Sequence, residues 1–186
     1  MRLDIRPLDL PGLMLIRGAR SGDRRGYFAE TYVQRDFAAA GIAQVFVQDN
    51  QSRSAAAGTV RGLHFQSPPM AQAKLIRVLR GKILDVVVDL RRASPGYGRH
   101  LTVELDAESG EQLYIPAGFA HGFCTLTADA EIFYKVDQVY SPQHDRGIHW
   151  TDPDLGIRWP VAPEAAVLSE RDAALPRLRD VTDVFA

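Results

Sequence analysis

The sequence predicts one mainly β domain, built as a sandwich or barrel with a few short helices. Its 186 residues are enough for one hydrophobic core and few for several domains. The 15 glycines and 11 prolines are scattered, and they separate short segments rich in Val, Ile, Leu, Phe and Tyr. Ten such segments occur, whereas helical patterns are few, and many short strands at regular intervals are typical of a sandwich or barrel.

The predicted strands are each bounded by turn residues. Gly12 precedes the first, Gly81 separates the fifth from the sixth, and Gly110 and Pro116 bracket the eighth. The small and polar residues 52–58 predict a loop. The ten predicted strands cover residues 13–17, 27–33, 44–48, 59–65, 74–79, 83–89, 100–105, 111–115, 122–127 and 131–136.

Two segments predict short helices. Residues 34–40 form about two turns, and Gly41 suits the position after the helix, where a left-handed conformation is common. Near the C-terminus, Ser169 is a good N-cap for residues 170–174, with Asp172 in the first turn, and Pro176 ends the helix. We therefore expect a single domain over residues 1–186, with a helical C-terminal segment from about residue 165.

Charge and cysteine content exclude several classes of protein. The 22 basic and 23 acidic residues nearly cancel, so no bulk field favours a nucleic acid or an anionic membrane. The N-terminus has no apolar signal region, and no stretch approaches 18 apolar residues, so we expect no membrane association. A lone cysteine, Cys124, excludes an intrachain disulfide and is typical of a reducing cytoplasm.

Unusual polar residues gather in three β-type segments, 23–30, 48–66 and 116–123. A lone strand histidine such as His64 is most often structural, and arginines on a strand most often face solvent. However, Arg61, Lys74 and Arg77 would form a basic site if their strands pair, and such a site inside a barrel needs an anion. By the two-residue period of a strand, Gly62 and His64 share one face.

Two spaced motifs resemble those of the cupins, which are double-sheet jelly-roll barrels. One joins Gly58 and His64 to Lys74 and Gly81, and the other contains PAG (116–118) and His121. Metal-binding cupins have a histidine and a glutamate where this chain has Gln66 and Lys74. A charged lysine has no lone pair for a metal, so we expect a metal-free barrel in which Lys74 supplies the positive charge.

A longer pattern, from about residue 10 to 178, resembles the dTDP-4-dehydrorhamnose 3,5-epimerase family. This resemblance implies a cofactor-free isomerase that converts dTDP-4-dehydro-6-deoxy-D-glucose to dTDP-4-dehydro-L-rhamnose, the third step of dTDP-L-rhamnose synthesis. The matching blocks are RGYFAE (25–30), FVQDNQS (46–52), VRGLHFQ (60–66), GKILDVVVDLR (81–91), SPGYG (94–98), IPAGFAHGF (115–123) and LSERD (168–172).

The resemblance also implies catalytic roles for four residues. His64 is the base that removes a proton beside the ketone, and Asp172 orients its imidazole. Tyr134 is the acid, because a phenol keeps its proton at neutral pH. Lys74 stabilises the enolate oxygen. Proton removal on one face of the sugar and return on the other, at C3 and at C5, is the chemistry that these side chains support.

The resemblance implies further contacts with a small-molecule dTDP-sugar and a homodimer whose N-terminal strands complete the partner's sheet. Phe28 and Tyr140 are candidates for stacking on the base or sugar, or for the core. The family often has His, Glu and Lys where this chain has Gln51, Asp145 and Arg171. These differences change the length of the side chains but not the sign of any charge. The implied substrate-binding residues are Arg25, Glu30, Gln48, Asp49, Asn50, Arg61, Lys74, His121, Tyr140, Asp145 and Arg171.

Two other functions remain open from the sequence. One is a 3-epimerase or 5-epimerase of a related nucleotide 4-keto-6-deoxy sugar, in which only one carbon reaches His64. The other is a non-catalytic, ligand-binding cupin, which the combined presence of His64, Lys74, Tyr134 and Asp172 disfavours. A metal-dependent cupin enzyme is disfavoured by Gln66 and Lys74.

Overall fold

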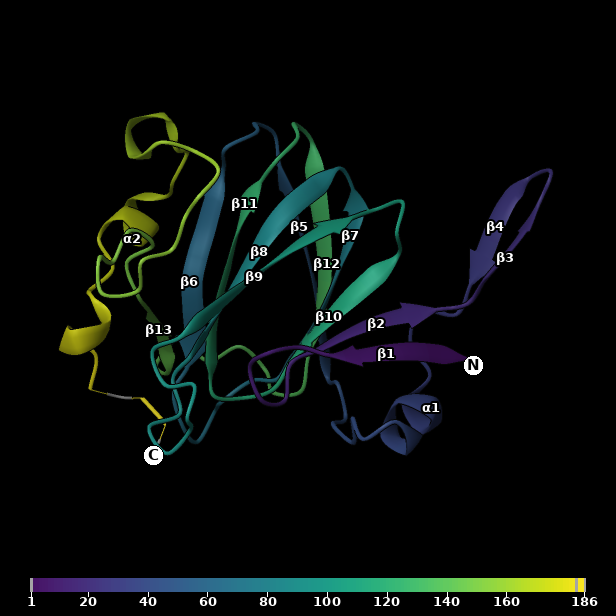
Figure 1. Cartoon of the computed structure of the whole chain (residues 1–186), viewed down its shortest axis with the longest axis horizontal. Coiled ribbons are helices and arrows are strands. Elements are labelled where there is room, and N and C mark those ends of the chain that lie inside the picture. The colour runs from purple at the N-terminus through teal and green to yellow at the C-terminus, as the bar shows by residue number, and fades with distance from the viewer. Residues whose placement is uncertain (1, 183, 186) are drawn as a thin grey trace.

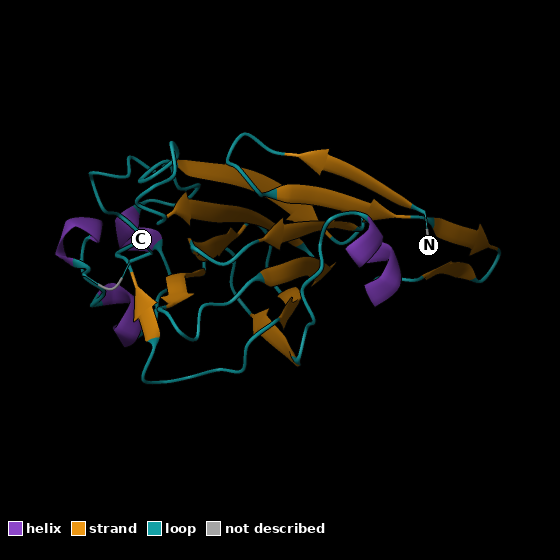
Figure 2. Ribbon diagram, turned by 90° about the horizontal axis from the view of Figure 1, so that it is seen from below, coloured by secondary structure: helices purple, strands orange, loops and turns teal. Residues whose placement is uncertain are grey.

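The computed structural model describes residues 2–182 and 184–185, and it confirms a mainly β jelly-roll sandwich of two antiparallel sheets (Figures 1 and 2). The six-stranded sheet contains, in spatial order, β1 (Leu3–Pro7), β2 (Met14–Gly18), β10 (Glu111–Ile115), β7 (Lys74–Arg80), β12 (Ala130–Val136) and β5 (Gln48–Ser54). The five-stranded sheet contains β13 (Asp145–Gly147), β6 (Val60–Gln66), β11 (Phe119–Thr125), β8 (Lys82–Asp89) and β9 (His100–Asp106).

Both predicted helices are confirmed. α1 (Gln34–Ala39) is followed by Gly41 at φ +91°, and α2 (Glu170–Ala173) begins after Ser169, whose hydroxyl accepts a hydrogen bond from the Asp172 N–H at 3.1 Å. Two 3₁₀ turns, η1 (Pro163–Ala165) and η2 (Leu178–Asp180), complete the C-terminal segment. The local capping chemistry of these segments therefore agrees with their fold.

Several strand boundaries were predicted wrongly. Residues 44–47 form no strand; instead β5 spans Gln48–Ser54 and includes part of the predicted loop 52–58. β11 begins at Phe119 instead of residue 122, and β4 ends at Ala29 instead of residue 33. β1, β3 and β13 were not predicted. β5 is polar because its alternate side chains face a polar interior, and pairing with β12 over seven residues sets its length.

The main core lies between the two sheets. Ile76 and Val78 on β7 pack with Val87, Leu113 and other apolar side chains from both layers. Lys74 has the same orientation on β7 as Ile76 and Val78, because successive side chains alternate. The inner face of β7 thus changes from apolar at Ile76 to charged at Lys74, two residues away. This change marks the end of the apolar core and the start of a polar cavity.

The C-terminal segment covers the outer face of the five-stranded sheet. Trp150 and Trp159 pack there, and the Val60 N–H donates to the Val167 carbonyl at 2.9 Å. A buried Asp152 carboxylate accepts the Leu178 N–H at 2.7 Å. These contacts place α2 beside β6, as Figure 1 shows.

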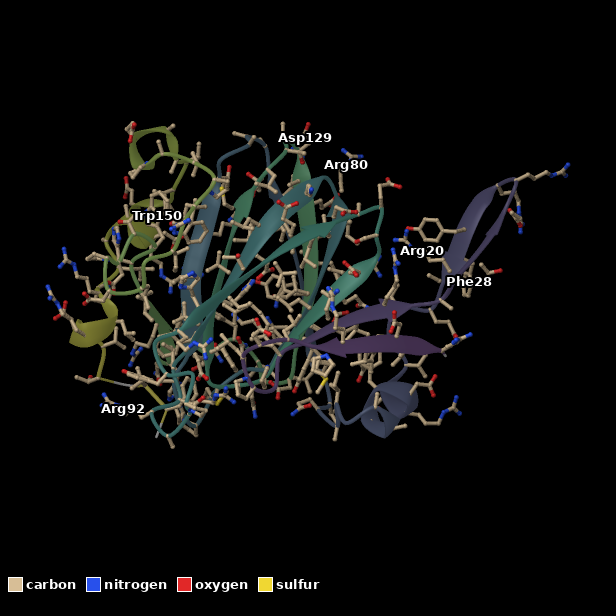
Figure 3. All side chains as sticks on the ribbon, viewed as in Figure 1. Arg20, Phe28, Arg80, Arg92, Asp129 and Trp150 are labelled. Carbon is tan, nitrogen blue, oxygen red and sulfur yellow. The ribbon has the colours of Figure 1, made fainter. Side chains whose placement is uncertain are left out.

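A hairpin of β3 (Arg20–Asp23) and β4 (Gly26–Ala29) extends away from the sandwich (Figures 1 and 3). Its Tyr27 and Phe28 are 59% and 72% exposed, which is unusual for large aromatic side chains. Within residues 2–182 and 184–185, no helix is long and apolar enough to cross a membrane.

Candidate active site

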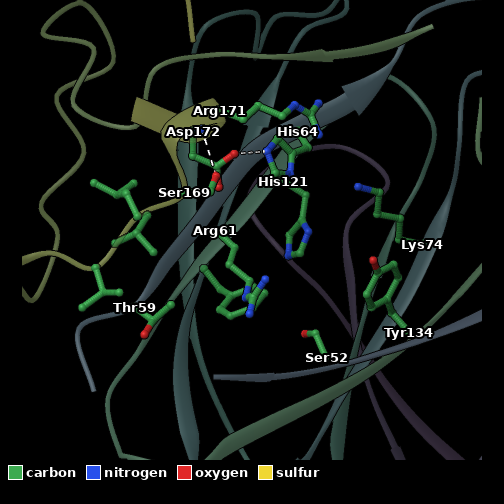
Figure 4. Close-up of a pocket in the computed structure, with 14 residues that line it drawn as sticks. Ser52, Thr59, Arg61, His64, Lys74, His121, Tyr134, Ser169, Arg171 and Asp172 are labelled. Atoms are coloured by element: carbon green, nitrogen blue, oxygen red, sulfur yellow. Dashed lines mark hydrogen bonds and ion pairs between the residues drawn. The ribbon is translucent and has the colours of Figure 1, made fainter. Parts of the chain in front are cut away.

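A cavity of about 510 Å³ lies between the two sheets and the C-terminal segment (Figure 4). His64 and His121 line it from β6 and β11, and Lys74 and Tyr134 line it from β7 and β12. Asp172 reaches it from α2. The structure thus brings together, from both sheets and from a distant helix, the four residues predicted to be catalytic.

His64 and Asp172 form a close pair. Nε2 of His64 lies 2.7 Å from Oδ1 of Asp172, whose other oxygen accepts the Gly62 N–H at 3.2 Å. Asp172 is only 4% exposed. Burial opposes its ionisation, but the hydrogen bonds from His64 and Gly62 and the nearby Arg171 hold its pKa below the usual value. An ionised carboxylate here fixes Nε2–H on His64 and leaves Nδ1 as the free base.

The approach of β6 to β11 beside this pair requires glycine. Gly62 has φ +111°, and a Cβ at this position would lie 2.6 Å from the Cα of Gly122 and 2.7 Å from the carbonyl oxygen of His121. Both neighbours are backbone atoms, which cannot rotate away. The Gly62 N–H can therefore reach Asp172 only because this residue has no side chain.

Lys74 and Tyr134 belong to neighbouring strands of the six-stranded sheet. Burial lowers the pKa of Lys74 to about 8, although the Asp145 and Asp85 carboxylates oppose this effect. In the described part of the chain, the Lys74 ammonium has no ion pair or hydrogen bond. Burial likewise raises the pKa of Tyr134, so its phenol keeps its proton. The cavity therefore holds the unpartnered Lys74 ammonium beside the neutral Tyr134 phenol.

A second carboxylate, on β8, contacts one of the histidines that line the cavity. Asp85 on β8 is fully buried, and its Oδ1 lies 2.9 Å from Nε2 of His121. Sequence reasoning missed Asp85 as a site residue. Its signal was a charged residue within the apolar run 83–88, because a buried charge needs a partner.

Besides Lys74, five of the predicted substrate-binding residues border an adjoining pocket of about 270 Å³, which shares His64, Lys74, Tyr134 and Arg171 with the cavity. There the Tyr140 hydroxyl donates to Asp145 at 2.8 Å, and Arg171 lies 2.7 Å from the same carboxylate. The other two, Gln48 and Asn50, are hydrogen-bonded to each other at 2.9 Å. Arg61, also predicted, lines the main cavity.

Three predicted substrate contacts lie elsewhere. Arg25 is at the tip of the hairpin, 3.0 Å from Asp23, and Glu30 lines a separate hollow beside the hairpin with Arg77. Asp49 pairs with Lys135 at 2.8 Å on the outer face of the six-stranded sheet. Successive side chains of a strand point to opposite faces of the sheet. Asp49 therefore points to the other face than Gln48 and Asn50, and Arg77 points to the other face than Lys74. Arg77 therefore does not join Arg61 and Lys74 in one basic site.

No group of three or more His, Cys, Asp or Glu side chains is placed to hold a metal ion among the residues that the structure describes. The cavity's polar side chains are suited instead to proton transfer and to binding a small anionic molecule.

Comparison with known proteins agrees with this geometry. The family model for dTDP-4-dehydrorhamnose 3,5-epimerase matches residues 7–180. The dTDP-4-dehydrorhamnose 3,5-epimerase of Sinorhizobium fredii is 52% identical over 96% of this chain and 91% of its own length.

Solved structures are similarly close. That of dTDP-4-dehydrorhamnose 3,5-epimerase from Bacillus anthracis, with TDP and PPi bound, has a TM-score of 0.92 at 44% identity and covers 95% of this chain and 99% of its own. That of dTDP-6-deoxy-D-glucose-3,5-epimerase from Legionella pneumophila, in complex with dTDP-4-keto-L-rhamnose, has a TM-score of 0.92 at 41% identity, with coverage of 97% and 95%. The cavity, its paired histidine and the match along nearly the whole chain lead to one conclusion: this chain belongs to the dTDP-4-dehydrorhamnose 3,5-epimerase family.

Proposed function

We propose that the protein converts dTDP-4-dehydro-6-deoxy-D-glucose to dTDP-4-dehydro-L-rhamnose by inverting C3 and C5. The observation that carries this proposal is the placement of the His64–Asp172 pair across one cavity from Lys74 and Tyr134 (Figure 4). A base on one wall and an acid on the other are what inversion of a carbon requires. The family membership supplies the substrate.

In the proposed mechanism, the neutral His64 imidazole takes a proton from the carbon beside the C4 ketone. Electrons of that C–H bond form the enolate, and the Lys74 ammonium stabilises the negative charge on its oxygen. Tyr134 then donates its phenolic proton to the opposite face of the carbon. Before the second carbon reacts, the His64 imidazolium releases its proton to solvent and the Tyr134 phenolate takes one up. The same sequence then inverts the second centre, because both C3 and C5 flank the ketone. Asp172 stabilises the imidazolium that forms in the first step.

The nucleotide part of the substrate would occupy the adjoining pocket. Tyr140 offers an exposed aromatic ring for the base, and Gln48 and Asn50 offer amide groups. Arg61, which lines the main cavity, has a guanidinium suited to the pyrophosphate. Asp145 and Arg171 border the same pocket and would exchange part of their mutual contact for substrate groups.

We also propose that the chain works as one domain, needs no metal, acts in the cytoplasm and forms a homodimer. In the dimer, the hairpin would carry Arg25 and Glu30 into the partner's site. The exposed Tyr27 and Phe28 support this proposal, because large aromatics on a projecting hairpin gain stability when a partner covers them.

Co-expression of Arg25→Ala and His64→Ala chains tests the hairpin exchange. Each variant alone is expected to be impaired, whereas a mixed dimer would contain one site with both native residues. Statistical mixing then restores about a quarter of wild-type activity. A mixture that shows only the average of the two variants would refute the exchange.

Deuterium incorporation tests the function itself. The protein is incubated in D₂O with dTDP-4-keto-6-deoxy-D-glucose, and C3 and C5 are followed by NMR. Exchange at both carbons is expected; exchange at one carbon would indicate a monoepimerase, and exchange at neither a binding protein. His64→Ala should abolish exchange, while His100→Ala, a histidine of the five-stranded sheet outside the cavity, should preserve it.

A further inference from the structure

The cavity contains a second histidine–carboxylate pair that the proposed mechanism does not use. His121 on β11 lies directly across from His64 on β6 in the sheet register. Its Nε2 is 2.9 Å from Oδ1 of Asp85, as the Nε2 of His64 is 2.7 Å from Asp172. Two imidazoles thus stand side by side, each with a carboxylate at the same ring nitrogen.

The environment of Asp85 shows where the proton of His121 resides. Asp85 is 0% exposed, and its Oδ1 lies 2.9 Å from Nε2 of His121. This contact is not aligned as a regular hydrogen bond, and among the described residues neither Asp85 oxygen has any other hydrogen-bond partner. A buried carboxyl oxygen without a hydrogen-bond donor beside it is costly. Nε2 of His121 is the nearest group that can supply that donor, and this nitrogen is itself completely buried.

The other ring nitrogen of His121 faces the cavity. Nδ1 has no hydrogen bond among the described residues and is not buried, and the ring lies in the cavity in Figure 4. The ionisable groups around the ring are Asp85 from β8, Lys74 from β7 and His64 from β6. Burial lowers the pKa of His121, Asp85 opposes this effect, and Lys74 and His64 add to it. At neutral pH the ring is therefore uncharged, with its proton on Nε2 and a lone pair on Nδ1.

We propose that Asp85 is a positioning residue that holds His121 as the Nε2–H tautomer, so that Nδ1 accepts a hydrogen bond from a hydroxyl group of the bound sugar. This inference rests on the proposed function. It separates the roles of two neighbours: the Lys74 ammonium donates to the enolate oxygen, and the His121 lone pair receives a hydroxyl proton. His121 then favours sugars with a hydroxyl within its reach, because a deoxy analogue leaves the lone pair unsatisfied.

The tautomer is tested by ¹⁵N NMR of histidine-labelled protein at neutral pH. The His121 signals, assigned by their loss in His121→Gln, should show a protonated Nε2 and an unprotonated Nδ1. In Asp85→Asn the carboxamide can donate to Nε2, so the proton should move to Nδ1. Asp152→Asn is the matched control: it removes an equally buried carboxylate outside the cavity and should leave His121 unchanged.

Two NMR results would overturn the inference: both nitrogens of His121 protonated in the wild type, or an unprotonated Nε2. An unchanged tautomer in Asp85→Asn would do the same. These measurements need no turnover, so they fail independently of the proposed function, which the deuterium experiment tests. If Asp85→Asn does not fold, the wild-type spectrum alone decides.

Kinetics provide the second readout. An acceptor for a spectator hydroxyl acts in the ground state and the transition state alike, so Asp85→Asn should raise KM about ten- to hundredfold with a smaller change in kcat. Lys74→Met, by contrast, should lower kcat. An equal loss of kcat in Asp85→Asn, with KM unchanged, would place His121 on the enolate oxygen instead and refute the division of roles.

Discussion

Replacing Lys74 by methionine should abolish turnover and at the same time stabilise the fold. The side chain is 8% exposed, and burial lowers its pKa from the ordinary 10.5 to about 8. This difference of about 2.5 pH units, at 1.36 kcal/mol for each, means that a charged Lys74 costs the folded protein about 3 kcal/mol at neutral pH. Methionine has a similar volume and no charge, so the free energy of unfolding should rise by up to this amount.

The sign of the effect depends on pH in a defined way. Below pH 8 the folded and unfolded chains both carry the proton, so the cost of the buried charge is complete. Between pH 8 and 10.5 only the unfolded chain keeps it, and the stability of the wild type rises by about 1.4 kcal/mol per pH unit from this group. The difference between wild type and Lys74→Met should therefore be largest at pH 7 and shrink above pH 8.

Thermal unfolding measured by calorimetry from pH 6.5 to 9.5 checks both statements. At pH 7 we expect the Tm of Lys74→Met to exceed that of the wild type by about 6 to 12 °C. Lys82→Met is the control, because the Lys82 side chain is 41% exposed and its ion pair with Glu104 is accessible to solvent, so its Tm should change little. A Tm of Lys74→Met equal to or below the wild-type value, or a difference that does not vary with pH, would refute the reasoning.

Three further results are expected. Activity should fall about tenfold per pH unit above pH 8, as Lys74 loses its proton, and Lys74→Arg should remove this alkaline decline in a pH–rate profile, since arginine stays charged. Asp172→Asn should keep the fold, as judged by circular dichroism, but lower kcat by about 10³- to 10⁴-fold, because His64 loses its carboxylate; a loss below tenfold would contradict the pairing. Gly62→Ala should cost more than about 2 kcal/mol in urea unfolding, because its Cβ would meet the backbone of Gly122 at 2.6 Å, and near-native stability would show that the strands can separate.

Much of the site was predictable from the chain because local chemistry and motif spacing carry it. Ser169 caps α2 as its residue type predicts. The strict two-residue period of β6 does not hold beside Asp172, because the register against β11 shifts there and Arg61 and His64, three residues apart, both line the cavity. Lys74 occupies the position of a metal ligand in the cupin motif, and this substitution alone predicted a cationic site. Residue type and motif spacing are local properties, so the sequence alone determines them.

Long-range pairing decided the rest. β5 is a polar strand only because β12 pairs with it, and that register turns Asn50 inward and Asp49 outward. Arg25 lies at the tip of the β3–β4 hairpin, outside the cavity of its own chain. The direction in which this hairpin projects cannot be predicted from the residue types alone. Asp85 meets His121 because β8 and β11 are neighbours. The sequence thus predicted the fold class, both short helices with their caps and the candidate catalytic residues. Only the packed sheets decided the bounds of several strands and which groups meet, because contacts between distant strands depend on the register of the whole fold.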